Sequence, residues 1–347
     1  SVSGLAKDVV PTMKQICHIF ADATFPKSEL KKAKKLKINA LNNISNDHSS
    51  IANRAFRSLS LSGSEFDNPT GGFIKTIKKI TQRSLGKKLV YFRDEVKKRV
   101  YLKGPSDILK IKDIILHDCG FKGEKSNYKR TTKKDRPISP NKKGIYLVTV
   151  PRANQAQVRV GKILNKKEIN DDALLLFTSK FLGGGFTSQL MQNIRVKAGL
   201  SYSVSAFAAG QREYGRSGIM TFTKNETVNQ LINVIKKTLE GVQGNKFSKE
   251  EFEHTRGYLI GSFPFAFEEA SHFMESLIQM DHQEKPHENL FNLPEKLKTI
   301  KSDDVARLSN QIFRWDEQTI VVVGPRSLAK KLKEIGKVNI ISYKKFL

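Results

Sequence analysis

The feature that most constrains this chain is an internal repeat at a spacing of 220 to 222 residues. Three pairs of short segments resemble each other, and they follow the same order in both copies. The pairs are Phe25–Leu30 with Phe247–Phe252, Ile80–Leu85 with Ile300–Val305, and Arg99–Pro105 with Thr319–Pro325. Because both order and spacing are kept, we interpret the chain as two copies of one folding unit.

The two copies are unequal in length. Residues 144–347 contain the elements of a complete copy, whereas residues 1–120 match only its second half. Residues 121–143 are rich in Lys and Arg, contain Pro137 and Pro140 and hold few apolar residues, which is typical of a solvated linker. We therefore expect the second half of a first domain at 1–120, a basic linker at 121–143 and a complete domain at 144–347. The first half of the first domain is expected to be missing before Ser1.

Apolar periodicity predicts helices that alternate with short strands, which indicates an α+β protein. In the first copy we expect a helix that begins at Asp47 or Ser49 and buries Ile51 and Phe56. The other helices of that copy are expected at 9–21, 28–46 and 106–118, with a strand at 98–103. In the second copy we expect strands at 145–150 and 155–163 and helices at 172–182 and 228–241.

Charge and cysteine content limit the partners of the chain. It carries 61 Lys or Arg against 34 Asp or Glu, a net charge of +27. Such an excess favours acidic partners, but the Lys residues are spread through many helices, so a general preference for Lys at solvated positions also explains it. No basic motif interleaved with aromatic residues is present, so we expect no specific nucleic-acid partner. No run of 18 apolar residues is present, so we also expect no transmembrane segment. Cys17 and Cys119 are the only cysteines, and Cys17 lies on an apolar helical face, which favours a buried free thiol over a bridge.

A glycine run opens the most distinctive stretch of the sequence. Gly183–Gly185 end one apolar helix, and we expect them to give the backbone access to positive φ. A second helix follows and is expected to end at Gly199. Strand-like residues 200–204 come next, so that Arg195 near the end of the helix and Tyr202 in the strand are seven residues apart.

This stretch resembles the glycine-rich loop and arginine–tyrosine segment of the insulinase/pitrilysin family of zinc metallopeptidases, which includes the mitochondrial processing peptidases. The resemblance covers nearly the whole chain, because that family is built from duplicated two-layer α/β domains joined by an extended linker. It implies an antiparallel or mixed sheet in each domain, with helices on one face. It also implies that Arg195 and Tyr202 hold the backbone of an extended peptide, which Gly183, Gly184 and Gly185 allow to approach closely.

The same resemblance implies zinc ligands at positions where this chain has none. The family places His-x-x-Glu-His on one helix and a further Glu on a later helix. None of the seven histidines stands in that motif, and His272-Phe-Met-Glu-Ser276 has Ser in place of its last His. The two later carboxylate positions, counted from Phe25, fall on Ala33 and Ala40. We therefore expect this chain to bind no cofactor and to carry no catalytic residue.

These expectations predict the zinc-less, substrate-binding subunit of an insulinase-like heterodimeric peptidase. Its expected partners are a homologous subunit that bears the zinc and an extended peptide substrate. Two alternatives stay open: a fragment of an active zinc metalloendopeptidase, and a non-enzymatic structural or assembly protein of the same fold. The expected location is the bacterial cytoplasm or periplasm.

Overall fold

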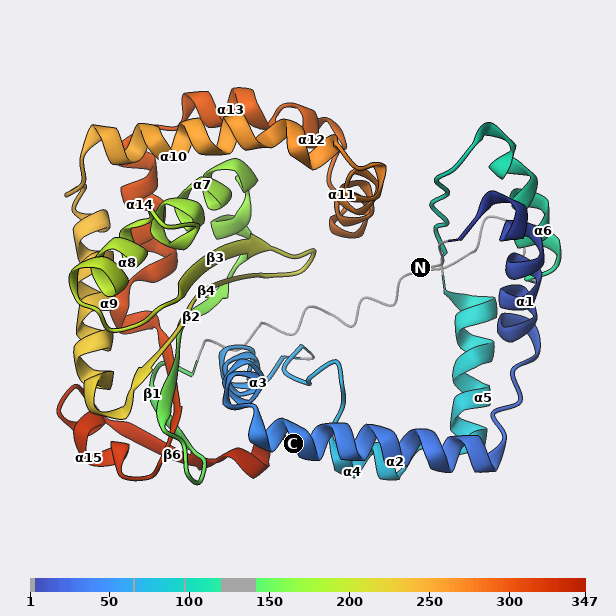
Figure 1. Ribbon diagram of the computed structural model, residues 1–347, viewed down its shortest axis with the longest axis horizontal. Coiled ribbons are helices and arrows are strands. Elements are labelled where there is room, and N and C mark those ends of the chain that lie inside the picture. Colours follow the sequence, from blue (N-terminus) through green and yellow to red (C-terminus); the bar gives the residue numbers. More distant parts are fainter. Residues whose placement is uncertain (1–3, 65, 97, 120–141) are drawn as a thin grey trace. The chain divides into compact units, whose positions relative to one another are not determined.

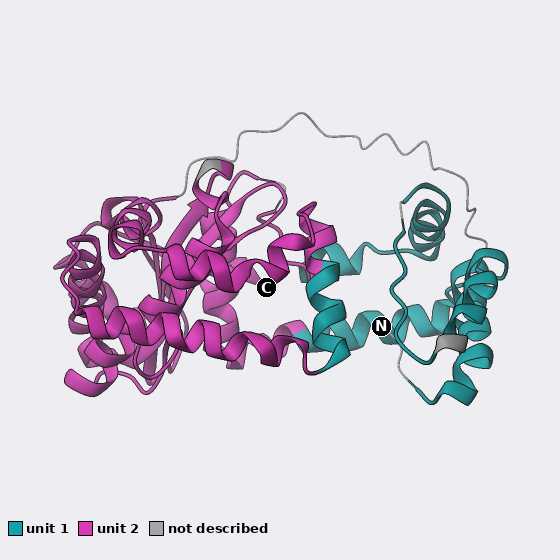
Figure 2. Ribbon diagram, turned by 90° about the horizontal axis from the view of Figure 1, so that it is seen from above, with its two compact units in different colours: residues 1–40, 73–135, 269–278 teal, residues 41–72, 136–268, 279–347 magenta. Residues whose placement is uncertain are grey.

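The computed structural model describes residues 4–64, 66–96, 98–119 and 142–347 (Figure 1). Contacts within the chain divide it into two compact units, each assembled from separate stretches of sequence (Figure 2). Unit 1 contains residues 1–40, 73–135 and 269–278, and unit 2 contains residues 41–72, 136–268 and 279–347. The predicted linker at 121–143 lies almost entirely outside the described residues.

Unit 2 is built on a six-stranded mixed sheet with the strand order β3-β4-β2-β5-β1-β6 (Figure 1). Strand β1 pairs in parallel with β5 and β6, whereas the other neighbouring strands pair in antiparallel fashion. The strands are β1 (Gly144–Thr149), β2 (Gln155–Leu164), β3 (Val204–Gly210), β4 (Gly215–Lys224), β5 (Thr319–Gly324) and β6 (Val338–Ser342). A mixed sheet combined with many helices confirms the predicted α+β class.

Three helices cover one face of this sheet and bury the larger hydrophobic core of unit 2. Side chains at alternate strand positions, such as Val158 and Val160 on β2, point into this core. Phe177 and Phe181 contribute aromatic rings from the helical side, and both rings pack against Phe252. The three helices are α7 (Asp172–Gly183), α9 (Val228–Gln243) and α14 (Ser302–Phe313) (Figure 1).

The opposite face of the sheet is covered by α3 (His48–Ser60), which belongs to the predicted first copy (Figure 1). Ile51 and Phe56 of α3 are buried against Val148 of β1 and Val321 of β5. The α-helices of the predicted second copy that pack on the sheet thus lie on one face, as expected, and a helix of the predicted first copy covers the other. The central strands present branched apolar side chains to both faces, so each face must be covered.

Because α3 packs on the sheet, residues 41–72 belong to unit 2. The compact units thus differ from the divisions at 1–120 and 144–347 that the repeat predicts. The repeat describes similarity between two stretches of sequence, whereas the units describe which residues contact each other. The incomplete first domain therefore stays a prediction. The predicted start of α3 is confirmed, since the Asp47 side chain accepts a hydrogen bond from Ser50 N at 3.0 Å.

A buried arginine fastens α3 to the sheet. Arg159 on β2 is 3% exposed, and its guanidinium donates to Asn53 Oδ1 and to Ser49 Oγ of α3, each at 2.8 Å. It also donates to the backbone oxygens of Val158 at 3.0 Å and Thr221 at 3.1 Å. Burial lowers the pKa of Arg159 to about 10, because the charged form loses its hydration. The side chain is still a cation at neutral pH.

The regular structure in the described part of unit 1 is helical. Its helices are α1 (Val9–Asp22), the first part of α2 (Lys27–Asn43), α4 (Ile74–Lys78), α5 (Gln82–Val90), α6 (Ile111–His117) and the first part of α11 (Ala270–Gln283). The predicted strand at 98–103 is wrong, because these residues find no strand to pair with among the described residues. The predicted helix at 106–118 forms as a 3₁₀ turn at Ser106–Lys110 followed by α6.

Unit 1 has a small core that a disulfide closes. Cys17 in α1 and Cys119 just after α6 are bonded to each other, so the expectation of a free thiol is wrong. The apolar face of α1 that buries Cys17 packs against α6, and this packing brings together two cysteines separated by 102 residues. Ile77, Ile111 and Ile115 are the only other buried apolar side chains in the described part of unit 1.

The sequence predicts the bounds of two helices in the second copy, and both helices form. Helices α7 and α9 match the expected ranges 172–182 and 228–241 to within two residues. Helices not yet given are α8 (Gln189–Met191), α10 (Lys249–Ser262), α12 (Glu288–Phe291), α13 (Leu293–Thr299) and α15 (Leu328–Lys333). Across the described residues, no helix combines the length and the apolarity needed to span a bilayer.

Lys162, a buried lysine on β2, makes unit 2 sensitive to acid. Its Nζ lies 2.9 Å from Glu168 Oε1 and 2.7 Å from Glu317 Oε2. The hydrogen bond from Lys162 lowers the pKa of Glu317 below its ordinary value, although partial burial opposes the shift. A carboxylate whose pKa is lowered by folding stabilises the folded state above its unfolded pKa, and this stability is lost as the pH falls through the folded pKa.

We therefore expect the urea midpoint of unit 2 to fall as the pH drops below about 4.3, the ordinary pKa of glutamate. The Glu317→Gln variant should start from a lower midpoint at pH 7 and should lose less of it on acidification. Exposed Glu295, which pairs with Lys298, provides a control through Glu295→Gln. Equal acid sensitivity of Glu317→Gln and the parent protein would contradict the role of this ion pair.

Candidate functional site

The glycine run lies at the end of α7, and its first two glycines are closely packed. Gly183, Gly184 and Gly185 are absent from the residues with positive φ, so that expectation is wrong. A Cβ on Gly183 would lie only 2.4 Å from the backbone nitrogen of Ala206 in β3. A Cβ on Gly184 would lie 2.6 Å from Cα of Lys180, whereas the surroundings of Gly185 are open. Gly183 therefore allows the end of α7 to touch β3.

The helix after the glycine run changes from an α-helical to a π-helical turn before it ends. Helix α8 passes at Gln192 into a π-helical turn that runs to Lys197. Gly199 stops it with φ of +61°, and the amide of Leu200 donates to the carbonyl of Ile194 at 2.9 Å. The predicted helix end at Gly199 is confirmed. Turns of the π type are frequent at functional sites, and this one carries Arg195.

The structure brings Arg195 and Tyr202 together at the surface of unit 2. Arg195 Nη1 donates to the backbone oxygen of Tyr202 at 3.4 Å. The Tyr202 side chain is 80% exposed, which excludes a role in the core. Strand β3 begins at Val204 rather than at residue 200, so Tyr202 stands in the segment that leads into the strand. Hydroxyl groups of β4 hold this segment, since Thr221 Oγ1 donates to the Ser203 carbonyl at 2.9 Å.

Phe186 is a third member of this surface cluster that sequence reasoning missed. Its ring is 70% exposed, and the Arg195 guanidinium lies 5.1 Å from the ring centroid. Such a contact orients the guanidinium and adds an apolar surface beside it. The signal in the sequence is a large aromatic residue directly after Gly185, at a position where no apolar period requires one. We call Phe186, Arg195 and Tyr202 the surface cluster.

The surface cluster lies next to a sheet edge. Strand β3 is the first strand in the order of the sheet, and β4 is its one partner there. One side of β3 therefore carries backbone groups that do not pair within the sheet. An extended peptide can add to such an edge through main-chain hydrogen bonds, with little dependence on its sequence.

The charge around the surface cluster is positive. Arg195 and Lys197 are both exposed, and Lys197 Nζ donates to Asn193 Oδ1 at 3.1 Å. Glu251 on α10 is engaged in the cap of that helix through Ser248. Burial alone would raise the pKa of Glu251, but hydrogen bonds from Ser248 and Gln189 lower it. The cluster can thus offer hydrogen-bond donors to carbonyl or carboxylate oxygens.

The positions where the resemblance implies carboxylate ligands carry methyl groups. Ala33 and Ala40 both lie on α2 with exposed side chains, and neither can ligate a metal. Among the described residues, no three His, Cys, Asp or Glu side chains lie close enough together to hold a metal ion. The donors that a zinc site needs are therefore missing from α2 itself.

The chain is similar in sequence to a family of peptidase-like proteins. Residues 110–259 match the family model described as the peptidase M16 inactive domain. An uncharacterized zinc protease of Streptomyces coelicolor is 23% identical over 144 residues, which cover 42% of this chain and 31% of that protein. A non-peptidase homolog, YmxG, of Helicobacter pylori is 26% identical over 163 residues, which cover 46% of this chain and 38% of that protein. The matched stretch thus spans about a third of the length of these relatives.

Solved structures share the fold over most of the chain. A peptidase M16 inactive domain from Pseudomonas fluorescens superposes with a TM-score of 0.75 at 17% identity, over 92% of this chain and 76% of that one. A protease from Helicobacter pylori gives a TM-score of 0.73 at 14% identity, over 92% and 77%. This chain is thus similar in sequence to the peptidase M16 inactive domain over residues 110–259, and it shares its fold with solved structures of that kind.

Proposed function

We propose that this chain is the zinc-less, substrate-binding subunit of an insulinase-like heterodimeric peptidase. The match to an inactive domain and the likeness to a non-peptidase homolog support a non-catalytic role. The observation that carries the proposal is the position of Arg195 and Tyr202. Both side chains are exposed, and the Arg195 guanidinium binds the Tyr202 backbone oxygen just before an edge strand begins. Such an arrangement serves to hold a chain rather than to build a core.

In this proposal an extended peptide pairs with the free side of β3. Its backbone carbonyls accept hydrogen bonds from the Arg195 guanidinium and from the Tyr202 phenol, which are both donors. Gly183 helps indirectly, because its lack of a side chain lets α7 support β3 from the sheet face. The Phe186 ring keeps the guanidinium oriented and offers a contact for an apolar side chain of the peptide.

The zinc and the water-activating glutamate would come from a homologous partner subunit. Ala33 and Ala40 support this division of labour, because a carboxylate at either place would be needed for a site on this chain. The purified chain is expected to contain no stoichiometric zinc and to cleave no peptide by itself. Peptidase activity is expected in its complex with a zinc-bearing homologue, and chelation should abolish it.

Two other outcomes distinguish the alternatives. Stoichiometric zinc in the purified full-length protein, together with peptide cleavage that chelation stops, would favour an active metalloendopeptidase. A complex that contains no zinc-bearing homologue and cleaves nothing would favour a structural or assembly role. Metal analysis of the complex purified from its natural source, with a quenched fluorescent peptide as substrate, separates all three results.

Arg195→Ala and Tyr202→Phe are expected to weaken peptide binding by about tenfold each, since each removes a donor to a substrate carbonyl. Turnover by the assembled pair should fall by about tenfold to a hundredfold, if the same donors stabilise the oxyanion. The measurement is fluorescence anisotropy of a labelled extended peptide, followed by kcat/KM of the pair. Lys197→Ala is the matched control, because it removes a cation from the same turn. Equal effects of Arg195→Ala and Lys197→Ala would reject the specific role of Arg195.

A further inference from the structure

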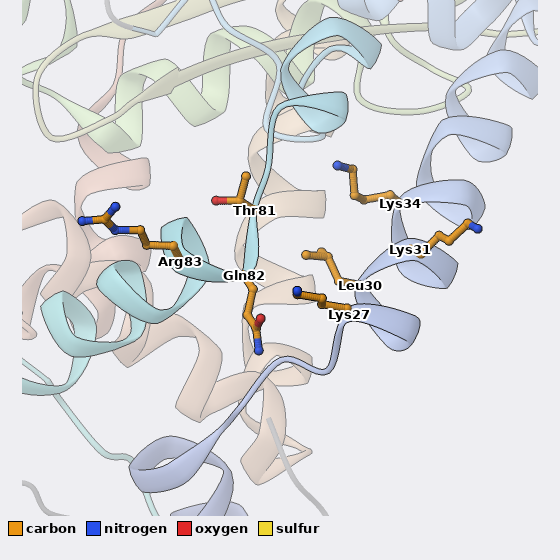
Figure 3. Close-up of a pocket in the computed structure, with 7 residues that line it drawn as sticks. All are labelled: Lys27, Leu30, Lys31, Lys34, Thr81, Gln82 and Arg83. Atoms are coloured by element: carbon orange, nitrogen blue, oxygen red, sulfur yellow. The ribbon is translucent and has the colours of Figure 1, made fainter.

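A second candidate site lies in unit 1 and shares no residue with the surface cluster. A cavity of about 470 Å³ opens between the first turns of α2 and the start of α5 (Figure 3). Its volume falls in the range of ligand pockets. Figure 3 shows Lys27, Leu30 and Lys34 reaching from α2 toward Thr81 and Gln82. The remaining lining residues are Lys31 and Arg83.

The lining of this cavity is strongly cationic. Four of its seven residues are Lys or Arg, and none is acidic. Lys34 is fixed in place, because its Nζ donates to the backbone oxygens of Lys78 at 2.7 Å and Ile80 at 2.9 Å. For Lys27, Lys31 and Arg83, no carboxylate in the described part of the chain lies within ion-pair distance. Three of the cations that line the cavity or its rim are thus available to an outside anion.

The surrounding sequence does not neutralise this charge. Residues 27–40 and 74–90 together carry twelve Lys or Arg and a single carboxylate, that of Glu29. On the helix, Lys27, Lys31 and Lys34 share one face, because they are spaced by four and three residues. Glu29 is two residues from Lys27 and therefore points to the opposite side of α2. Its charge is turned away from the cavity.

We propose that this cavity binds an acidic peptide segment through its aspartate or glutamate side chains. Lys27 points from α2 into the cavity and receives one carboxylate, Arg83 at the start of α5 points outward and receives another at the rim, and Leu30 contacts their methylene groups. No aromatic side chain lines the cavity, so it lacks the stacking surface that single-stranded nucleic acid uses. Leu30 is its one apolar residue, which leaves little to enter a lipid bilayer. This site is independent of the surface cluster in unit 2.

The test measures binding of a fluorescein-labelled, glutamate-rich decapeptide to the full chain by anisotropy. The parent protein is expected to bind it, and binding should weaken as salt rises, since exposed ion pairs are screened. The Lys27→Glu/Arg83→Glu variant should bind at least about tenfold more weakly, because both positions then repel carboxylates. The same peptide with Gln in place of Glu should bind neither protein.

The matched control is Lys330→Glu/Lys333→Glu, which changes the net charge equally at two exposed lysines of α15 in unit 2. Its affinity for the glutamate-rich peptide should stay within about twofold of the parent value. Equal weakening by both double variants would overturn the proposal, since binding would then depend on net charge alone. It would also be overturned if polyuridylate or phosphatidylserine vesicles bind the parent protein more tightly than the peptide does and lose that binding in Lys27→Glu/Arg83→Glu.

Discussion

Replacement of Arg159 by methionine is expected to lower the free energy of unfolding of unit 2 by about 3–5 kcal/mol. Methionine fills much of the volume of the arginine stem, so the loss does not arise mainly from a cavity. It arises because Asn53 Oδ1, Ser49 Oγ and two backbone oxygens lose their donor in a buried place. A buried acceptor without a partner keeps its full desolvation penalty.

Urea unfolding followed by tryptophan fluorescence measures this loss, since Trp315 lies in unit 2. Arg307→Met is the matched control, because the Arg307 side chain is 66% exposed and pairs with one acid. It should change the free energy of unfolding by no more than about 0.5 kcal/mol. Hydrogen exchange measures the local effect, because the amides of α3 should lose their protection first in Arg159→Met. A loss in Arg159→Met as small as that in the control would show that the guanidinium does not hold α3.

Reduction of the Cys17–Cys119 disulfide is expected to destabilise unit 1 by about 2–5 kcal/mol. The bond closes a loop of 102 residues in sequence, and long loops lose the most chain entropy when they are closed. Unit 1 has little else to compensate for the loss, since Ile77, Ile111 and Ile115 are the only other buried apolar side chains in its described part. A domain with so small a core depends on a covalent link.

Thermal unfolding with and without a phosphine reductant tests this expectation. The Cys17→Ser/Cys119→Ser variant should unfold at the lower temperature under both conditions, so the reductant should affect only the parent protein. Two free thiols that react in the native, unreduced protein would contradict the bond. Of the two compartments expected from the sequence, we propose the periplasm, because disulfides persist in oxidising compartments.

Local sequence signals predicted the elements well. Asp47 begins α3 and Gly199 ends the π-helical turn as expected, because capping depends on residues within one turn. The periodic apolar residues of α7 and α9 located those helices to within two residues. The spacing of Arg195 and Tyr202 is visible in the sequence, and the structure shows that the short helix and its stop bring the Arg195 guanidinium to the Tyr202 backbone oxygen. These signals act within one element or across one turn.

Most of the wrong predictions concern contacts between distant parts of the chain. The sequence at 98–103 has strand-like residues, but a strand needs a partner, and periodicity does not report one. The pairing of Cys17 with Cys119 depends on the packing of α1 against α6. Phe186 was missed because its exposure depends on the bend of the backbone after Gly185. The glycine run predicts a backbone with positive φ, whereas Gly183 is in fact required because a side chain there would clash with Ala206 of β3.

The attachment of α3 to the sheet has a consequence for the order of events during synthesis. Helix α3 leaves the ribosome long before β5, on which it packs, and Arg54 at its centre donates to the Phe346 carbonyl at 2.6 Å. The apolar face of the nascent helix therefore stays incompletely covered until β5 is made, and the last of these contacts forms only when Phe346 follows, 292 residues after Arg54. During that interval the growing chain is a natural client for chaperones that bind exposed amphipathic helices.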